Sequence, residues 1–200
     1  IQVDFDHIWQ DNYNKYIFAY KSVLENESSF LKSGVILETS YITISFPTEK
    51  KEVSSFIGNM MKTEAPDFIE KFGLENFYMK TQSIERTFID KVFALCDYFL
   101  QNKIPSHSRH IYDIYKLLPS INFDENFSNL ILDVREVRKT SPICVSSDEK
   151  YKITDLLKEI ITKEIYKKDY ENITEKILEE PIKYETSITA LKKIIEKDIF

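Results

Sequence analysis

The residues best suited to chemistry are a lysine and an aspartate that lie 22 positions apart near the middle of the chain. Lys91 comes three residues after Phe88 and four before Leu95, at the edge of an apolar stripe. An ammonium group in such a place needs either solvent or an anionic partner. Asp113 stands in a similar position beside apolar residues. Such a pair most often forms a partly exposed ion pair, which stabilises a protein little.

The loop between these two positions favours an anion. It has five polar residues in succession, which include two of the three histidines: Ser106, His107, Ser108, Arg109 and His110. Backbone N–H groups and the dipole at the amino end of a helix attract negative charge. Together with Lys91, this loop predicts a phosphate-sized positive site with Asp113 at its rim. His107 and His110 could instead ligate a metal ion, as in a phosphohydrolase or a nuclease.

Two helices must position these residues. The first is predicted from about Ser83, a good N-cap, to Gln101. Apolar residues recur in it at three- and four-residue steps and predict one buried stripe, made of Ile84, Phe88, Val92, Leu95 and Phe99. The second helix begins near Ser108, and Pro119 ends it.

The rest of the chain predicts an α+β fold. β-branched and aromatic residues predict strands in the N-terminal part, at residues 1–8, 16–20 and 35–46. The connector that follows Pro47 predicts two helices and a short strand, at 52–62, 67–72 and 77–79. Helical patterns fill the C-terminal part, at 122–139, 149–166, 169–180 and 184–198, and from Asp148 onward they are rich in Lys, Glu and Ile. We expect two domains, an α/β part at 1–119 and a helical part at 120–200.

Composition excludes a globally basic nucleic-acid binder. The net charge is −6 and the pI is about 5.3, so any contact with RNA must use a local basic patch. One basic cluster, Arg135, Arg138 and Lys139, is either favourable charge at a helix end or the rim of an RNA-binding face. Cys96 and Cys144 lack the spacing of metal ligands, and no apolar run is long enough to span a membrane. These features predict a cytoplasmic protein in a reducing compartment.

The central motif resembles that of a known toxin family. The segments Arg86–Lys91 (RTFIDK) and Ser108–Leu117 (SRHIYDIYKL) are similar to the "ERTFWEK … SRHYYDL" signature of the AbiEii/MenT nucleotidyltransferase toxins. Those proteins are the toxin halves of type IV toxin–antitoxin and phage-defence pairs. Two flanking segments, Gly34–Glu38 (GVILE) and Lys168–Tyr170 (KDY), resemble further family patterns. The resemblance therefore covers most of the chain.

The resemblance implies a reaction and a set of site residues. It implies transfer of a nucleotide from an NTP, with Mg²⁺, to an RNA acceptor, tRNA in particular, and a cognate antitoxin as a partner. Lys91 and Asp113 would be essential in the active site, and four further residues would bind nucleotide phosphates: Arg86, Ser108, Arg109 and His110. Glu38 is either a salt-bridged edge carboxylate or a further metal ligand. The implied fold is the remainder of a nucleotidyltransferase-like sheet with flanking helices, followed by a C-terminal helical bundle.

The sequence departs from the family pattern at one motif. The family core begins with Gly-Ser followed by an Asp-x-Asp pair that holds the metal and the nucleotide phosphates. No Gly-Ser dipeptide occurs among these 200 residues, and the segment Asp4–Asp6 only matches the letters of the aspartate pair. We therefore expect the C-terminal two-thirds of a longer toxin, inactive by itself. The alternative is a non-catalytic toxin remnant that binds RNA or a partner protein.

Overall fold

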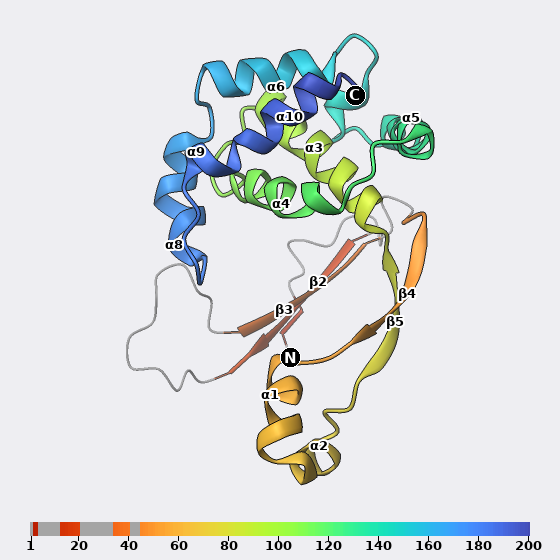
Figure 1. Ribbon diagram of the computed structural model, residues 1–200, viewed down its shortest axis with the longest axis vertical. Coiled ribbons are helices and arrows are strands. Elements are labelled where there is room, and N and C mark those ends of the chain that lie inside the picture. The colour runs from red at the N-terminus through yellow and green to blue at the C-terminus, as the bar shows by residue number, and fades with distance from the viewer. Residues whose placement is uncertain (1, 4–12, 21–33, 41–44) are drawn as a thin grey trace.

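The computed structural model describes residues 2–3, 13–20, 34–40 and 45–200, and the structural statements below concern these residues. They form a helical body and two small antiparallel sheets (Figure 1). This architecture confirms the predicted α+β class.

The N-terminal sheet has three strands in the order β1-β2-β3. They are β1 (Gln2–Val3), β2 (Tyr13–Ala19) and β3 (Gly34–Ser40). The register pairs Tyr13 with Ser40 and Lys15 with Glu38. Parts of the predicted strands at 1–8 and 35–46 lie outside the described residues.

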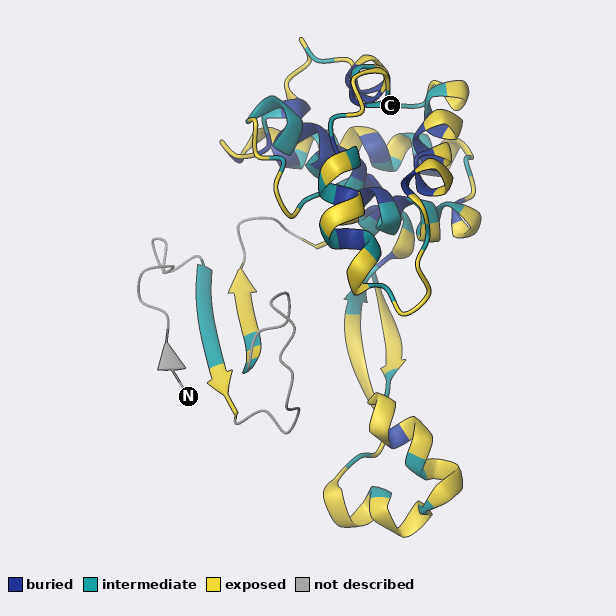
Figure 2. Ribbon diagram, turned by 90° about the vertical axis from the view of Figure 1, so that its left-hand side faces the viewer, coloured by how far each residue is buried: buried dark blue, intermediate teal, exposed yellow. Residues whose placement is uncertain are grey.

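The second sheet is a two-stranded ribbon that carries a helical tip. Strands β4 (Thr48–Val53) and β5 (Phe77–Gln82) pair antiparallel, and α1 (Phe56–Glu64) and α2 (Pro66–Phe72) join their far ends. Figure 2 shows this arm projecting from the helical body with nearly all of its surface exposed. The start predicted for the first helix, residue 52, was wrong, because residues 52 and 53 belong to β4 and α1 begins at Phe56. Charged residues dominate β4, so it lacks the alternation of apolar and polar residues that would predict a strand.

The helical body follows the predicted order of elements. α3 (Ile84–Leu100) and α4 (Arg109–Leu117) hold the central motif, and Ser83 caps α3 by accepting a hydrogen bond from the Arg86 N–H. The remaining elements, in chain order, are η2 (Leu118–Ser120), α5 (Glu125–Lys139), η3 (Val145–Ser147), α6 (Ile153–Thr162), α7 (Lys167–Asp169), the π-helical η4 (Tyr170–Thr174), α8 (Glu175–Ile177), α9 (Tyr184–Ser187) and α10 (Thr189–Lys197).

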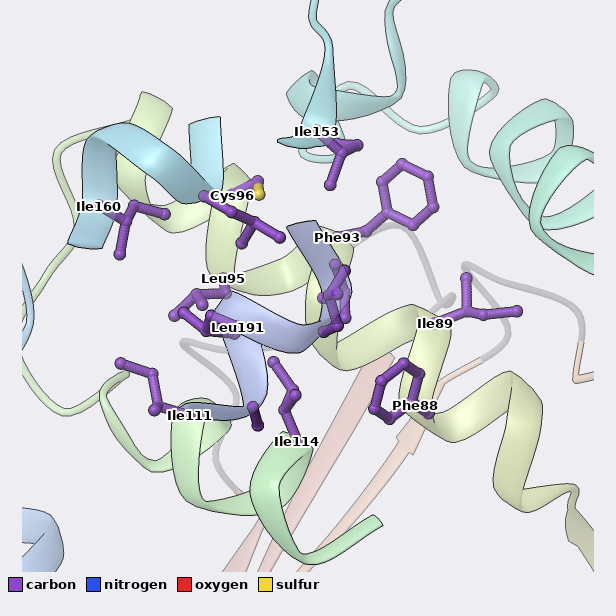
Figure 3. Close-up of a cluster of buried hydrophobic side chains, with 14 of the residues drawn as sticks. Phe88, Ile89, Phe93, Leu95, Cys96, Ile111, Ile114, Ile153, Ile160 and Leu191 are labelled. Atoms are coloured by element: carbon purple, nitrogen blue, oxygen red, sulfur yellow. The ribbon is translucent and has the colours of Figure 1, made fainter. Parts of the chain in front are cut away.

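Helix α3 lies at the centre of the hydrophobic core. Figure 3 shows its side chains meeting those of α4, α6 and α10 in one cluster. The predicted stripe is only part of the buried surface, since Ile89, Phe93 and Cys96 are fully buried as well. Besides α4, the elements α5, η3 and α6 also contact α3 and cover a second side of it. Residues before and after position 119 share this cluster, and the domain division there stays a prediction.

Candidate functional site

Lys91 and Asp113 form an ion pair between α3 and α4. The Lys91 Nζ lies 2.8 Å from the Asp113 Oδ2, and each side chain is 31% exposed. Lys91 extends from the edge of the buried stripe of α3, while Asp113 lies beside the buried Ile114 on α4 and is itself only partly exposed. The pair is therefore fixed by the core yet accessible from solvent.

His110 supports the pair from the protein side. Its ring is 7% exposed and stacks parallel to Tyr98, with ring centroids 5.6 Å apart. The His110 Nδ1 lies 3.5 Å from the Lys91 Nζ and 3.6 Å from the Asp113 Oδ2. Burial lowers the pKa of His110 below its ordinary value of 6.5, so the imidazole is neutral at pH 7.

The Asp113 carboxylate stays ionised beside this neutral ring. Burial acts to raise the pKa of Asp113, but the contacts with His110 and Lys91 and the charge of Lys91 outweigh it, and the pKa falls below 3.8. At neutral pH the site therefore presents one ammonium and one carboxylate.

The amino end of α4 already holds an anion from the protein itself. The Asp169 carboxylate accepts hydrogen bonds from the Ser106 N–H at 2.8 Å and the Ser108 N–H at 3.1 Å. The buried Ser108 hydroxyl lies 2.7 Å from the Thr174 hydroxyl. The backbone donors expected to bind a phosphate are thus used to attach the loop to α7 and η4. The resemblance marked the KDY segment that contains Asp169, but it did not indicate this contact.

The remaining loop residues differ in their access to solvent. Arg109 is exposed and lies one turn before Asp113 on α4, on the same face of the helix. His107 packs on Tyr98 with ring centroids 3.6 Å apart, and burial lowers the pKa of His107. Arg109 is therefore the loop side chain best placed to meet a phosphate that approaches Asp113.

Arg86 lies inside the protein. Its side chain is 1% exposed, its Nε donates to the Asp90 Oδ2 at 2.9 Å, and one Nη donates to the Phe46 carbonyl at 3.1 Å. The guanidinium also lies over the Phe46 ring, 4.7 Å from its centroid. The structure places Arg86 at the root of the β4–β5 arm and does not bring it to the Lys91–Asp113 pair through any of these contacts.

Arg138 continues this buried network. It bridges Asp90 at 2.8 Å and Asp97 at 2.5 Å, and it is 7% exposed. Asp97 also accepts hydrogen bonds from the N–H and the hydroxyl of Ser146. The alternative that Arg138 forms the rim of an RNA-binding face is wrong, because two carboxylates hold its guanidinium in the interior.

The described residues do not make up a metal site. Among them, no three His, Cys, Asp or Glu side chains are grouped so that they could hold an ion. His107 and His110 are not part of any such group. Glu38 is exposed on β3 opposite Lys15, and the Asp4–Asp6 segment lies outside the described residues. Across the same residues, no helix combines the length and apolarity needed to cross a bilayer.

Comparison with known proteins identifies the family. Residues 1–194 match the family model for the nucleotidyl transferase AbiEii toxin of type IV toxin–antitoxin systems. The chain belongs to this family of toxin nucleotidyltransferases, which confirms the resemblance drawn from the central motif. Searches of curated proteins and of solved structures gave no match.

Proposed function

We propose that this chain takes part in the transfer of a nucleotide from an NTP to an RNA acceptor, tRNA in particular. The observation that carries the proposal is the ion pair of Lys91 and Asp113, at the family's signature positions, half-buried and open to solvent. An ion pair this exposed contributes little to the stability of the fold. Its exposure therefore supports a role in binding or catalysis.

Lys91 and Arg109 would neutralise the charge of the triphosphate. An ammonium acts as a point charge on phosphate oxygens, and a guanidinium can bind two of them at once. In the reaction, the acceptor hydroxyl oxygen forms a bond to the α-phosphorus, the bond to the β-phosphate oxygen breaks, and pyrophosphate leaves with that electron pair.

Asp113 is better suited to orient Lys91 than to act as a general base. A general base works best when its pKa is near the operating pH, and the pKa of Asp113 is lowered instead. The ionised carboxylate would hold the Lys91 ammonium toward the triphosphate, while the hydroxyl proton passes to water.

The reaction needs groups beyond these residues. The family's nucleotidyltransferase activity supports NTP and Mg²⁺ as cofactors, with a cognate antitoxin in the same cytoplasm as a functional partner. The Gly-Ser and Asp-x-Asp motif of the resemblance does not occur in the 200 residues. We therefore propose that this chain does not transfer nucleotides unless that motif is supplied. The proposed roles of Arg86, Ser108 and His110 as phosphate ligands, and of Glu38 as a metal ligand, are open to the same assay.

The test is a mass-spectrometric transfer assay with total tRNA, Mg²⁺ and each NTP. It compares the 200-residue chain with the protein encoded by the whole gene. We expect the latter to extend tRNA, and Lys91→Ala and Asp113→Ala each to abolish the extension. Lys163→Ala is the matched control, since Lys163 only pairs with Glu159 on the exposed side of α6. If the whole-gene protein is inert with every nucleotide, the chain is a non-catalytic remnant and the proposal fails.

A further inference from the structure

A groove lined by lysines runs between α10, η2 and the end of α4. Two adjoining cavities, of about 430 and 300 Å³, form it, and they share Leu118, Pro119 and Lys193 as walls. Helix α10 packs against α4 in the helical body. The groove is therefore built on the same helix that carries Asp113.

The charge of this groove is opposite to that of the chain as a whole. Lys116, Lys193 and Lys197 line it, against one carboxylate, Glu196. The whole sequence instead has 33 acidic and 27 basic residues. Within the described part of the chain, none of these three ammonium groups is paired with a carboxylate. Such a local excess of cations is an electrostatic footprint for a polyanion.

Apolar side chains lie between the lysines. Leu118, Pro119 and Phe123 line one cavity, and Tyr115 lines the other. The Lys197 Nζ lies over the Phe123 ring, 5.9 Å from its centroid. Lysines beside the partly exposed rings of Tyr115 and Phe123 suit a single-stranded nucleic acid, whose phosphates meet the cations while its bases or riboses meet the apolar wall.

The groove continues from the candidate site. Arg109, Asp113 and Lys116 occupy positions i, i+4 and i+7 of α4, so they share one face of that helix. Lys116 therefore begins the groove one helical turn beyond Asp113. A strand bound along it would have its end next to the Lys91–Asp113 pair.

We infer that this groove binds the phosphate backbone of the RNA acceptor and leads its reactive end to Lys91 and Asp113. The inference rests on the proposed function, because it names the surface that would hold the acceptor of that reaction. An acidic peptide shares the negative charge of RNA but lacks its rings, and the experiment below separates the two.

The test measures binding of a fluorescent single-stranded RNA to the 200-residue chain by anisotropy, without NTP. The groove variant is Lys116→Gln/Lys193→Gln/Lys197→Gln. Its matched control, Lys150→Gln/Lys158→Gln/Lys163→Gln, removes the same charge from lysines that already pair with Asp148, Asp155 and Glu159. Circular dichroism melting checks that both variants fold.

We expect the groove variant to lose RNA affinity by more than about tenfold and the control by less than about twofold. Each lost phosphate contact reduces the magnitude of the slope of log affinity against log salt by about 0.7. Loss of three contacts should therefore reduce it by about 2. Equal affinity of the two folded variants would overturn the inference, as would loss of binding to a poly-glutamate peptide with unchanged binding to RNA. Because this assay contains no transfer step, failure of the groove and failure of the proposed reaction give different results.

Discussion

The Asp169 carboxylate accepts a hydrogen bond from the Ser108 N–H at 3.1 Å, across 61 positions of sequence. Its other oxygen accepts one from the Ser106 N–H at 2.8 Å. These two bonds hold the amino end of α4, which carries Arg109, His110 and Asp113. The position of the candidate site therefore depends on a residue of the C-terminal part of the chain.

Replacement of this carboxylate should loosen the loop and destabilise the fold. We expect Asp169→Ala to lower the free energy of unfolding by about 1–2 kcal/mol, because two backbone donors lose their acceptor at a helix end. Urea denaturation would measure it. Asp155→Ala serves as the control, since Asp155 makes only an exposed ion pair with Lys158, and it should change stability by less than about 0.5 kcal/mol. Equal effects of the two variants would contradict the capping role.

The buried network around Arg138 predicts a larger loss. Arg138→Ala leaves Asp97, which is 4% exposed, without its cation, and we expect a cost of about 3–5 kcal/mol. Arg135→Ala is the internal control, because Arg135 also lies over the Phe93 ring, 5.6 Å from its centroid, but forms no buried ion pair with the described residues. It should cost less than about 1 kcal/mol. Thermal unfolding of both variants checks the difference, and a small effect of Arg138→Ala would show that Asp97 is satisfied by Ser146 alone.

Stability should increase with pH near neutrality. Burial lowers the pKa of His110 and of His107 in the folded state, so the unfolded chain binds protons that the folded chain does not. The free energy of unfolding should therefore fall as the pH drops through 6.5 and below, toward the folded pKa values. The contribution of Asp113, whose pKa is lowered, is lost only below its ordinary value of 3.8.

Urea titrations between about pH 5 and pH 7.5 would measure this slope. His110→Gln should make it shallower, because one of the two histidines with a lowered pKa no longer titrates. A slope that is unchanged in His110→Gln would show that His110 binds its proton equally in the folded and unfolded chains.

The Lys91–Asp113 pair should matter far more for transfer than for stability. Asp113→Asn keeps the shape of the side chain and removes its charge, and we expect it to cost less than about 1 kcal/mol because the pair is one-third exposed. In the whole-gene protein, nucleotide transfer should fall by more than about 100-fold. The charge swap Lys91→Asp/Asp113→Lys should melt near the parent temperature and remain inactive. Transfer by the swapped variant would mean that the pair acts only as a structural bridge.

Local pattern predicted the central helices well, because their signals are local. Ser83 as the N-cap of α3 and the three- and four-residue steps of Phe88, Val92 and Leu95 depend on neighbours within one or two turns. The burial of Ile89 and Phe93 was not predictable in this way, because it depends on which distant helices cover the second face of α3.

The long-range contacts of the site could not be predicted from the sequence either, because they also depend on which distant elements meet in the fold. Asp169 lies more than sixty positions from the loop that it holds, and nothing in its own surroundings indicates that partner. Arg86 and Arg109 show that the exposure of a motif residue could not be predicted from the sequence either. Both are arginines of the signature, and the resemblance implied phosphate binding for both, yet one is buried and the other exposed.

The place of α10 in the core has a consequence for biosynthesis. Leu191 and Ile194 belong to the same cluster as Phe88 and Ile111, so the first helix of the core to be translated finds part of its packing surface only about a hundred residues later. A nascent chain that ends before α10 leaves apolar surface of α3 and α4 uncovered. Completion of the core, and with it a fixed position for Asp113 beside Lys91, must wait until translation has passed residue 194.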